Sequence, residues 1–399
     1  PLLDLILNTE SAIDEVIDVT GRAAIEAILL LSAQEVVGKP HPGKKQGPVY
    51  RNGSQNGVVS LSSRKVRVNK PRLRHKETGE VSIPAYEAML NNSRLGQRIL
   101  EILMKGVSTR NYQTVIPEMA ETVGVSKSQI SREFIEISSR QFQTFCERDF
   151  SDKDILVIYL DGIRFGPFHV IAALGIDSDG HKHVLGIREG ASENSVIVKD
   201  LLNDLVERGI DPQQKRLFVI DGSKALRKGV SEVFGPGNPV QRCRNHKMVN
   251  VLGYLHKDQH DQVRSAMKAS FQLEEKKGMA QLNKLADWLD QEHGSAAESL
   301  REGLKEMFTI NRLGLPATLR RCLGSTNVIE SPNSGIRQKT GRVTQWKDGQ
   351  MVLRWCTSAL LATEKNFRRI MGYRDLWMLK AKLEDAVDGK TIANNDEAA

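Results

Sequence analysis

The chain has 399 residues, of which 40% are hydrophobic and 27% charged, a composition that supports folded domains and excludes a fibrous or disordered chain. Its formal charge of +8 and pI near 9.2 favour a polyanionic partner if the basic residues are clustered. The four cysteines are scattered, and we find neither a stretch that would span a bilayer nor a signal peptide. We therefore expect a soluble intracellular protein with no membrane partner.

The first 90 residues contain two segments of different charge. Residues 1–38 carry acids and aliphatics at helical spacing and predict an N-terminal helical segment. Residues 39–90 form a basic region in which Lys39 to Lys76 includes eleven Lys or Arg and no Asp or Glu. Its alternating stretch VVSLSSRKVRV predicts a strand or β-ribbon. Unopposed charges favour phosphate contact over the alternative, a solvated linker. The predicted DNA contacts are Arg51, Arg64, Lys65, Arg67, Lys70, Arg72 and Arg74.

Residues 91–150 predict a helical domain with the layout of a helix-turn-helix. In RNYQTVIPEMAETVGVSKSQISREF, a turn at VGVS separates two helices, and Ser126 is a natural N-cap for the second. The second helix of such a motif can enter a major groove, so the predicted DNA contacts are Lys127, Gln129 and Arg132. The alternative is an ordinary helical hairpin with a glycine turn.

Residues 151–246 predict a mixed α/β sheet. DILVIYLDGI, FHVIAALGIDSDG and KHVLGIREG are three consecutive strand patterns of a meander, with DSDG as a hairpin turn. A helix, a strand, a second helix and a strand near PVQRC follow. Residues 247–323 are almost wholly helical and have the character of an insertion, after which the sheet domain resumes at 324–375. Residues 376–399 predict a C-terminal helix and tail.

Two apolar strands of this sheet end on an aspartate followed by glycine, Asp161 in YLDG and Asp221 in VIDG. Buried carboxylates are costly unless they are paired or bind a cation, and adjacent strands would bring these two together. Oxygen ligands favour Mg²⁺, with Mn²⁺ as a substitute, and two ions about 4 Å apart assist in-line phosphoryl transfer. The alternative for both pairs is turn chemistry, since Asp-Gly is common in turns.

A third acid lies in GSTNVIESPNSGIRQKTGRVTQW. Glu330, Asn333 and Arg337 fall at i, i+3 and i+7 on one helix face. Glu330 would complete the metal site, and the alternative is an ordinary surface acid. The residues predicted to meet DNA here are Asn333, Arg337, Lys339 and Arg342.

Taken together, YLDGIRFG, VIDGSKAL, CRNHKMVN and STNVIESPNSGIRQKTGR resemble the mutator-type transposases of bacterial insertion sequences. YRNG, KPRLRH and GVSTRNY resemble the N-terminal half of that family, so the resemblance covers about residues 50–370. It implies an α/β ribonuclease H-like catalytic domain with an all-α insertion, preceded by the helical DNA-binding region. It also implies a DDE triad of Asp161, Asp221 and Glu330 that binds two Mg²⁺ ions.

The implied activity is cleavage and strand transfer of double-stranded DNA at terminal inverted repeats and at a target. The implied setting is a homodimer in the bacterial cytoplasm, associated with the nucleoid. The family's Cys-x-x-His motif corresponds to Cys243 and His246, so the resemblance implies that His246, with Lys247, lies near the cut DNA. The alternative for the motif is a packed pair at a strand end. Trp288 corresponds to a tryptophan that stacks on a displaced base, the alternative being a core residue.

Two positions depart from the family pattern. Val249 stands where arginine is usual, which removes a phosphate contact, and Pro332 predicts that the helix of Glu330 starts late or kinks. Two other functions stay open. One is a DNA-binding regulator with an inactive ribonuclease H-like domain, which the three intact acids oppose. The other is a hydrolytic nuclease without strand transfer, which would use the same metal site.

Overall fold

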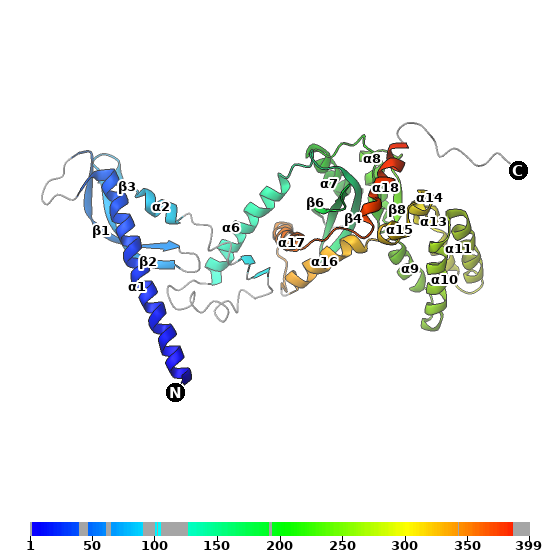
Figure 1. The fold of residues 1–399 in the computed structure, drawn as a ribbon, viewed down its shortest axis with the longest axis horizontal. Helices are drawn as coiled ribbons and strands as arrows, with labels where there is room; N and C mark the ends of the chain where they lie inside the picture. The colour runs from blue at the N-terminus through cyan, green and yellow to red at the C-terminus, as the bar shows by residue number, and fades with distance from the viewer. Residues whose placement is uncertain are drawn as a thin grey trace. The chain divides into compact units, whose positions relative to one another are not determined.

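A computed structural model describes residues 2–39, 47–60, 65–90, 100–101, 103–104, 127–190, 194–341 and 343–385. The chain divides into two compact units, residues 1–137 and 138–399, which we describe one at a time. Figure 1 labels the helices and strands of both.

The first unit contains a three-stranded antiparallel sheet covered by a long helix. Helix α1 (Leu2–Val37) precedes strands β1 (Val49–Ser60), β2 (Lys65–His75) and β3 (Gly79–Val81), paired in the order β1-β2-β3, and helix α2 (Pro84–Leu90) follows. The core joins Ile25, Leu29 and Ala33 of α1 to alternate apolar residues of the strands, which include Val66, Val68 and Leu73. The predicted helical segment and β-ribbon are therefore present.

Helix α6 (Lys127–Cys146) corresponds to the second helix of the predicted helix-turn-helix. The whole first helix and the turn, predicted within residues 110–126, lie outside the described residues.

The second unit is built on a five-stranded mixed sheet. Its strands are β4 (Ile155–Phe165), β5 (Phe168–Asp177), β6 (Lys182–Gly190), β7 (Leu217–Ile220) and β8 (Val240–Arg242). They lie in the order β6-β5-β4-β7-β8, with β4, β5 and β6 antiparallel and β4, β7 and β8 parallel. The predicted meander and the strand near PVQRC are both confirmed.

Helices cover both faces of this sheet, which explains why β4 is buried along nearly its whole length. Helix α7 (Ser195–Glu207) and helix α8 (Lys224–Val233) form one core with Ile158 and Leu160 of β4. Side chains alternate along a strand, so Asp161 faces away from that core. Helix α16 (Asn327–Thr340) packs on β4, and α17 (Gly349–Glu364) packs on β5 and β6.

The region between β8 and α16 is helical, as predicted, and part of it has a core of its own. This core, formed from α9 to Phe308, includes Val251, Met267, Leu282 and Leu300. The helices are α9 (Arg244–Leu252), η1 (Lys257–Gln259), α10 (His260–Gln272), α11 (Glu275–Leu289), α12 (Gly294–Arg301), α13 (Leu304–Met307), α14 (Thr309–Arg312) and α15 (Ala317–Leu323). Past α17, η2 (Tyr373–Asp375) and α18 (Leu376–Asp385) lead to residues 386–399, which lie outside the described part.

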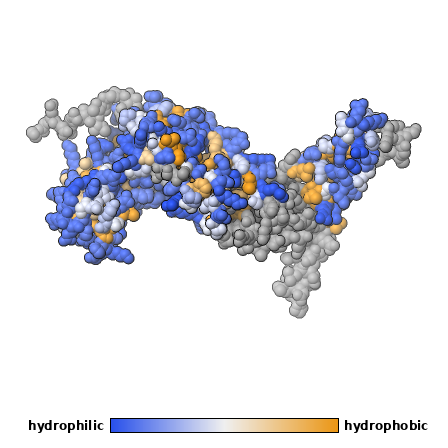
Figure 2. Space-filling view, turned by 180° about the vertical axis from the view of Figure 1, so that it is seen from behind, coloured by the Kyte–Doolittle hydropathy of each residue, from blue (hydrophilic) through white to orange (hydrophobic). Residues whose placement is uncertain are grey.

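Hydrophilic residues predominate on the face drawn in Figure 2, and hydrophobic ones form small patches. Among the described helices, none combines the length and apolarity needed to cross a membrane.

Candidate metal centre

Two aspartates lie next to one another on parallel strands. Leu160 of β4 pairs with Ile220, the last residue of β7, so Asp161 is the next residue of β4 and Asp221 directly follows β7. The expectation that Asp161 ends its strand is wrong, because β4 continues to Phe165 and Asp161 itself pairs with Ala172 of β5. The neighbouring strand β7 ends at Ile220, so from Asp161 onward β4 has no partner strand on that side. The turn alternative therefore does not explain Asp161.

Asp221 does lie in a turn. Its Oδ1 accepts a hydrogen bond from the backbone N–H of Ser223 at 2.8 Å, and Ser223 caps α8. Gly222 has a φ of +107°, and a Cβ there would lie 2.2 Å from Nε of Arg242, so only glycine fits. The turn fixes the Asp221 carboxylate beside β4, so turn chemistry and a ligand role are compatible here.

Helix α16 brings the third acid to the pocket of Asp161, which Asp221 does not line. Asp161, His246, Glu330, Asn333 and Arg337 line one pocket of about 290 Å³, which confirms the predicted shared face of Glu330, Asn333 and Arg337. The prediction that Pro332 delays the helix is wrong, because α16 begins at Asn327 and continues through the proline. Glu330 is thus inside the first turns of a formed helix.

Asn333 binds Asp161 directly. Its Nδ2 donates to Asp161 Oδ2 at 2.6 Å, and its side chain is buried. Its amide nitrogen is thus engaged by the carboxylate, and a DNA contact of Asn333 stays a prediction. Its Oδ1 is buried and has no hydrogen-bond partner among the described residues. An oxygen without a donor, beside a buried carboxylate, suits a cation.

The electrostatics of Asp161 point the same way. Burial, first of all, raises the pKa of this carboxyl group to about 6. The negative charges of Asp221 and Glu330 raise it further, whereas His246 and the Asn333 hydrogen bond oppose the rise. Asp161 therefore lies close enough to both other carboxylates to be repelled by them, and added positive charge would relieve this repulsion. The oxygen donors present fit Mg²⁺ or Mn²⁺.

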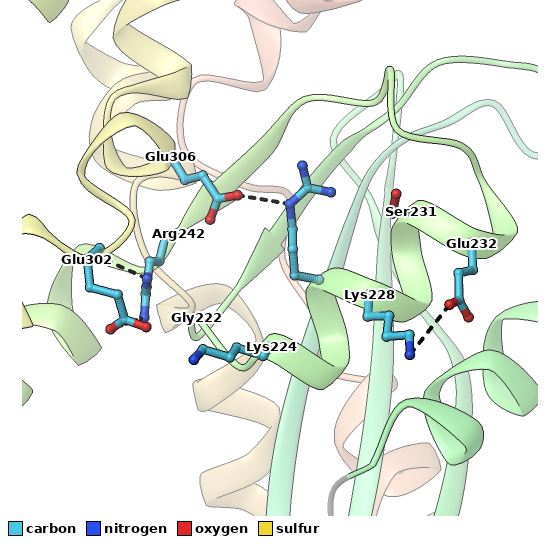
Figure 3. A pocket seen from close by; sticks show the side chains of 9 residues that line it. Gly222, Lys224, Lys228, Ser231, Glu232, Arg242, Glu302 and Glu306 are labelled. Carbon is cyan, nitrogen blue, oxygen red and sulfur yellow. Dashed lines mark hydrogen bonds and ion pairs between the residues drawn. The ribbon is translucent and has the colours of Figure 1, made fainter.

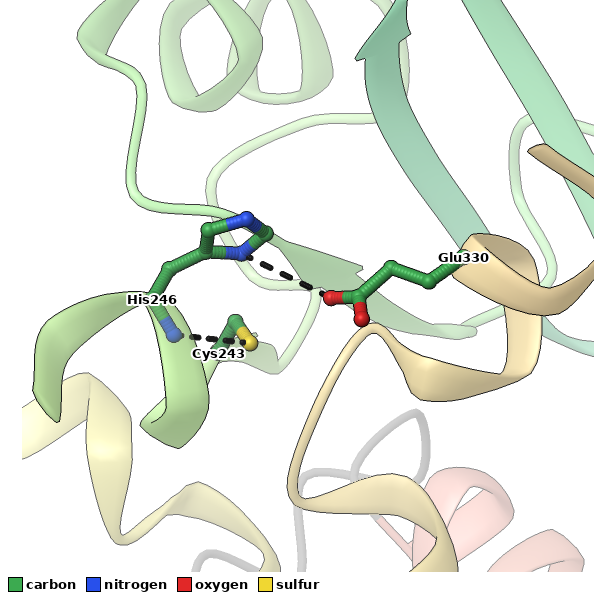
Figure 4. A group of neighbouring side chains, drawn as sticks. All are labelled: Cys243, His246 and Glu330. Atoms are coloured by element: carbon green, nitrogen blue, oxygen red, sulfur yellow. Dashed lines mark hydrogen bonds and ion pairs between the residues drawn. The ribbon is translucent and has the colours of Figure 1, made fainter. Parts of the chain in front are cut away.

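Cys243 and His246 lie beside Glu330, but they face different surroundings. Cys243 is fully buried at the N-cap of α9, and its Sγ accepts from the backbone N–H groups of His246 and Thr326 at 3.4 and 3.3 Å. The His246 ring is partly exposed, and its Nδ1 lies 3.9 Å from Glu330 Oε1 (Figure 4). Cys243 is therefore a packed residue at a strand end, whereas His246 lines the pocket.

The charges of this pair are coupled. A hydrogen bond with Cys243, first of all, raises the pKa of His246 to about 9, and the nearby Asp161 and Glu330 charges add to the rise. Burial raises the pKa of the Cys243 thiol, but hydrogen bonds from His246 and Thr326 outweigh it and lower the pKa below its ordinary value. A cationic His246 would supply part of the positive charge that the acids need.

Ligand atoms of Cys243, His246 and Glu330 all lie within 4.8 Å of one another. The spacing of these atoms would permit a bound metal ion, but the surroundings of the Cys243 sulfur do not favour one. The Cys243 sulfur is already occupied by hydrogen bonds, and Cys243 is not among the residues that line the pocket. Asp161, Asp221 and Glu330 do not meet this spacing among the described residues, and they stay a predicted centre whose donors are all oxygens.

The structure contradicts the predicted DNA contact of Lys247 and leaves that of Trp288 open. Lys247 is fully buried, and its Nζ donates to the backbone oxygen of Ser299 and to Glu302 Oε2 at 3.1 Å, so it joins α9 to α12 instead of facing DNA. The core alternative for Trp288 is wrong, because 42% of this residue is exposed while Leu282, Ala286 and Leu289 form the buried face of α11. Base stacking by Trp288 stays a prediction.

The predicted basic contacts of the first unit lie on β1 and β2. Val66, Val68 and Leu73 point into the core, so Arg67, Arg72 and Arg74 lie on the opposite, solvent face of β2. Arg72 pairs with Glu80 at 3.5 Å, and Lys70 Nζ lies 3.7 Å from the centre of the Tyr86 ring. Arg67 and Arg74 are exposed and are the best placed for phosphate.

The other predicted contacts are less defined. Arg51 donates to the backbone oxygen of Gly38, Arg132 and Arg337 are exposed, and Lys339 is partly exposed. Arg64 and Arg342 lie outside the described residues, as do the side chains of Lys65, Lys127 and Gln129.

A second pocket, of about 490 Å³, begins at Gly222 (Figure 3). Most of its cations are neutralised by acids. Arg227 pairs with Glu306 at 2.9 Å and Arg242 with Glu302 at 3.1 Å. Lys224 is exposed and is not among the predicted DNA contacts, although it stands in the basic stretch SKALRKG. Acid-paired cations attract phosphate weakly, so the pocket at Asp161 is the stronger candidate.

A mixed sheet with two adjacent aspartates, faced by a glutamate on a covering helix, defines an α/β protein with a candidate metal centre. Residues 4–369 match the family described as Transposase, Mutator family, and the chain belongs to that family.

Named relatives agree with this assignment. The chain is 25% identical over 389 residues to the transposase for insertion sequence element ISRM5 of Rhizobium meliloti, covering 93% of this chain and 92% of the relative. It is 26% identical over 335 residues to the transposase for IS905 of Lactococcus lactis, covering 80% of each. It is 25% identical over 305 residues to the transposase for IS1201 of Lactobacillus helveticus, covering 72% and 78%.

Proposed function

We propose that the chain is a DNA transposase that binds the terminal inverted repeats of an insertion sequence and catalyses metal-dependent cleavage and strand transfer. The observation that carries this proposal is the pocket that Asp161 and Glu330 line together, where the charges of Glu330 and of the nearby Asp221 help to raise the pKa of the buried Asp161. Membership in a transposase family supports the same substrate class. The strand order β6-β5-β4-β7-β8 supports a ribonuclease H-like fold for residues 151–246 and 324–375, interrupted by the insertion at 247–323.

The residues that would hold two Mg²⁺ or Mn²⁺ ions are Asp161, Asp221 and Glu330. When bound, the ions supply positive charge that favours attack on a phosphodiester and departure of the leaving oxygen. Asn333 holds Asp161, and the exposed Arg337 would contact a DNA phosphate at the same pocket. Water would attack one phosphodiester and break its P–O3′ bond, which leaves a 3′-hydroxyl and a 5′-phosphate. That 3′-hydroxyl would then form a new P–O bond at a second phosphodiester as the 3′-oxygen of that phosphodiester leaves.

DNA would be held mainly by the exposed arginines Arg67 and Arg74 of β2 and by Arg132 of α6. We further propose that the protein acts as a homodimer in the bacterial cytoplasm, at the nucleoid.

The proposal is tested with labelled terminal-repeat DNA and Mg²⁺. We expect nicked and joined products from the natural protein, and neither from Asp161→Ala, Asp221→Ala or Glu330→Ala, each of which should still bind the DNA. Substantial cleavage by one variant would remove that residue from the triad. Nicking without joining would indicate a hydrolytic nuclease, and binding without cleavage a regulator.

A further inference from the structure

Thr326 stands at the N-cap of α16, but its hydroxyl does not cap the helix. The residue is fully buried, and its Oγ1 instead donates to Glu330 Oε1 at 2.6 Å. A threonine at this position ordinarily accepts from a backbone N–H of the first turn. Here the hydroxyl is directed at the carboxylate of the candidate metal centre.

The other neighbours of this hydroxyl come from α9. Cys243 Sγ and His246 Nδ1 each lie 3.2 Å from Thr326 Oγ1. A hydroxyl carries one hydrogen, so it donates to the nearer and charged acceptor, Glu330. Its lone pairs can accept from the ring N–H of His246, and Cys243 Sγ is a second, weaker acceptor for the hydroxyl. The backbone N–H of Thr326 also donates to Cys243 Sγ at 3.3 Å, so the thiol fixes this residue from two sides.

Glu330 is therefore attached to Thr326 at two points. Its backbone N–H donates to the Thr326 backbone oxygen at 2.9 Å, and its carboxylate accepts from the Thr326 hydroxyl. One turn further along α16, Asn333 binds Asp161. The helix segment that carries Glu330 is thus tied to α9 at one end and to β4 at the other. A partly exposed glutamate without these ties would sample several rotamers.

We propose that Thr326 is a positioning residue that holds the Glu330 carboxylate at the pocket that Asp161 also lines, with buried Cys243 as its anchor. This role rests on the proposed function, because it concerns the same metal centre. It assigns the Cys243 thiol a supporting contact instead of a metal bond. It also explains why a sulfur in contact with α16 is buried behind the pocket.

The test compares full-length variants in Mn²⁺ binding without DNA, measured by electron paramagnetic resonance of free Mn²⁺, and in single-turnover nicking of terminal-repeat DNA across Mg²⁺ concentrations. Thr326→Val should weaken Mn²⁺ binding about 10- to 100-fold and raise the Mg²⁺ requirement by a similar factor. DNA affinity in EDTA should change less than about 2-fold, since no phosphate contact is removed. Thr326→Ser keeps the hydroxyl and should stay within about 3-fold of the natural protein.

The matched control is Thr357→Val, because Thr357 is equally buried on α17 and its Oγ1 has no partner among the described residues. Equal losses in both valine variants, or natural Mn²⁺ binding by Thr326→Val, would overturn the positioning role. Thr326→Ala replaces Thr326→Val if thermal unfolding shows that the latter does not fold.

Glu330→Gln separates this inference from the proposed function. Natural nicking by Glu330→Gln would remove the triad and the positioning role together. Loss of nicking in Glu330→Gln, with natural Mn²⁺ binding and nicking in Thr326→Val, would remove the positioning role alone.

Discussion

Asp161 is a residue whose charge destabilises the protein in the absence of metal. The residue is 8% exposed, its carboxyl group is repelled by two other acids, and one hydrogen bond among the described residues, from Asn333, holds it. A buried carboxylate in such surroundings costs folding free energy that only a bound cation would return. Function and stability are therefore opposed at this position.

We predict that Asp161→Asn stabilises the metal-free second unit by about 1–2 kcal/mol, seen as a rise of about 3–6 °C in Tm in EDTA. The amide is neutral and can donate to the unpartnered Oδ1 of Asn333. Added Mn²⁺ should raise the Tm of the natural protein but not of the variant. Asp154→Asn is the control and should lower Tm, because Lys380 and Gln214 donate to Asp154. A lower Tm for Asp161→Asn in EDTA would contradict the argument.

The hairpin between β5 and β6 contains Asp177, an aspartate whose pKa is lowered where that of Asp161 is raised. Asp177 Oδ1 accepts from the backbone N–H groups of Asp179 and His181, and its Oδ2 lies 2.7 Å from His183 Nε2. Burial raises the pKa of Asp177, but the His183 and His181 hydrogen bonds outweigh it and lower the pKa below its ordinary value. The charged form is thus preferred in the folded state.

The sign of the pH effect follows from this lowered pKa. The stabilisation is present above about pH 4, the unfolded pKa of an aspartate, and is lost as the pH falls through the still lower folded pKa. We predict that Asp177→Asn costs about 1–2 kcal/mol at pH 7 and that the difference from the natural protein shrinks below pH 4. Denaturant unfolding between pH 3 and 7 measures it, with the exposed Asp179→Asn as control. A pH-independent difference would rule out the carboxylate as its source.

Lys247, which connects α9 to α12, and the exposed Arg337 should respond differently to mutation, one in stability and the other in DNA binding. Lys247→Met removes the donor to Ser299 and Glu302, so we expect a loss of about 1–3 kcal/mol in unfolding free energy and an unchanged salt dependence of DNA binding. Arg337→Met, on the exposed face of α16, should leave stability unchanged and reduce the slope of log K against log salt by about 1. The reverse pattern would restore Lys247 as a DNA contact.

Periodicity predicted the elements of the second unit well, because β4 to β6, α7 and α8 have local apolar patterns bounded by turn residues. It placed Asp161 at a strand end because it could not show that the β4–β5 hairpin extends beyond β7. The burial of Lys247 depends on Glu302, 55 residues away. Thr326 meets Cys243 across 83 residues, although its place four residues before Glu330 was visible in the sequence.

At the scale of the whole molecule, the candidate DNA contacts on β2 and the candidate metal centre fall in different compact units. Arg67 and Arg74 lie in residues 1–137, whereas Asp161, Asp221 and Glu330 lie in residues 138–399. Core residues of the two units form separate clusters, with the sheet core of the second unit distinct from the core under α1. Binding and metal loading should therefore be separable by mutation.

We predict that Arg67→Gln with Arg74→Gln lowers DNA affinity and reduces the salt slope by about 2, at about 0.9 for each lost phosphate contact. Mn²⁺ should still raise the Tm of the second unit in this variant. Asp221→Ala should show the reverse, with natural DNA binding in EDTA and no rise in Tm on adding Mn²⁺. Arg22→Gln controls for the loss of positive charge itself. Arg22 lies on α1, which covers the face of the sheet opposite to Arg67 and Arg74. If the double arginine variant kept the full salt slope, β2 would not be a DNA contact, and the basic region would be a solvated surface whose charge serves another purpose.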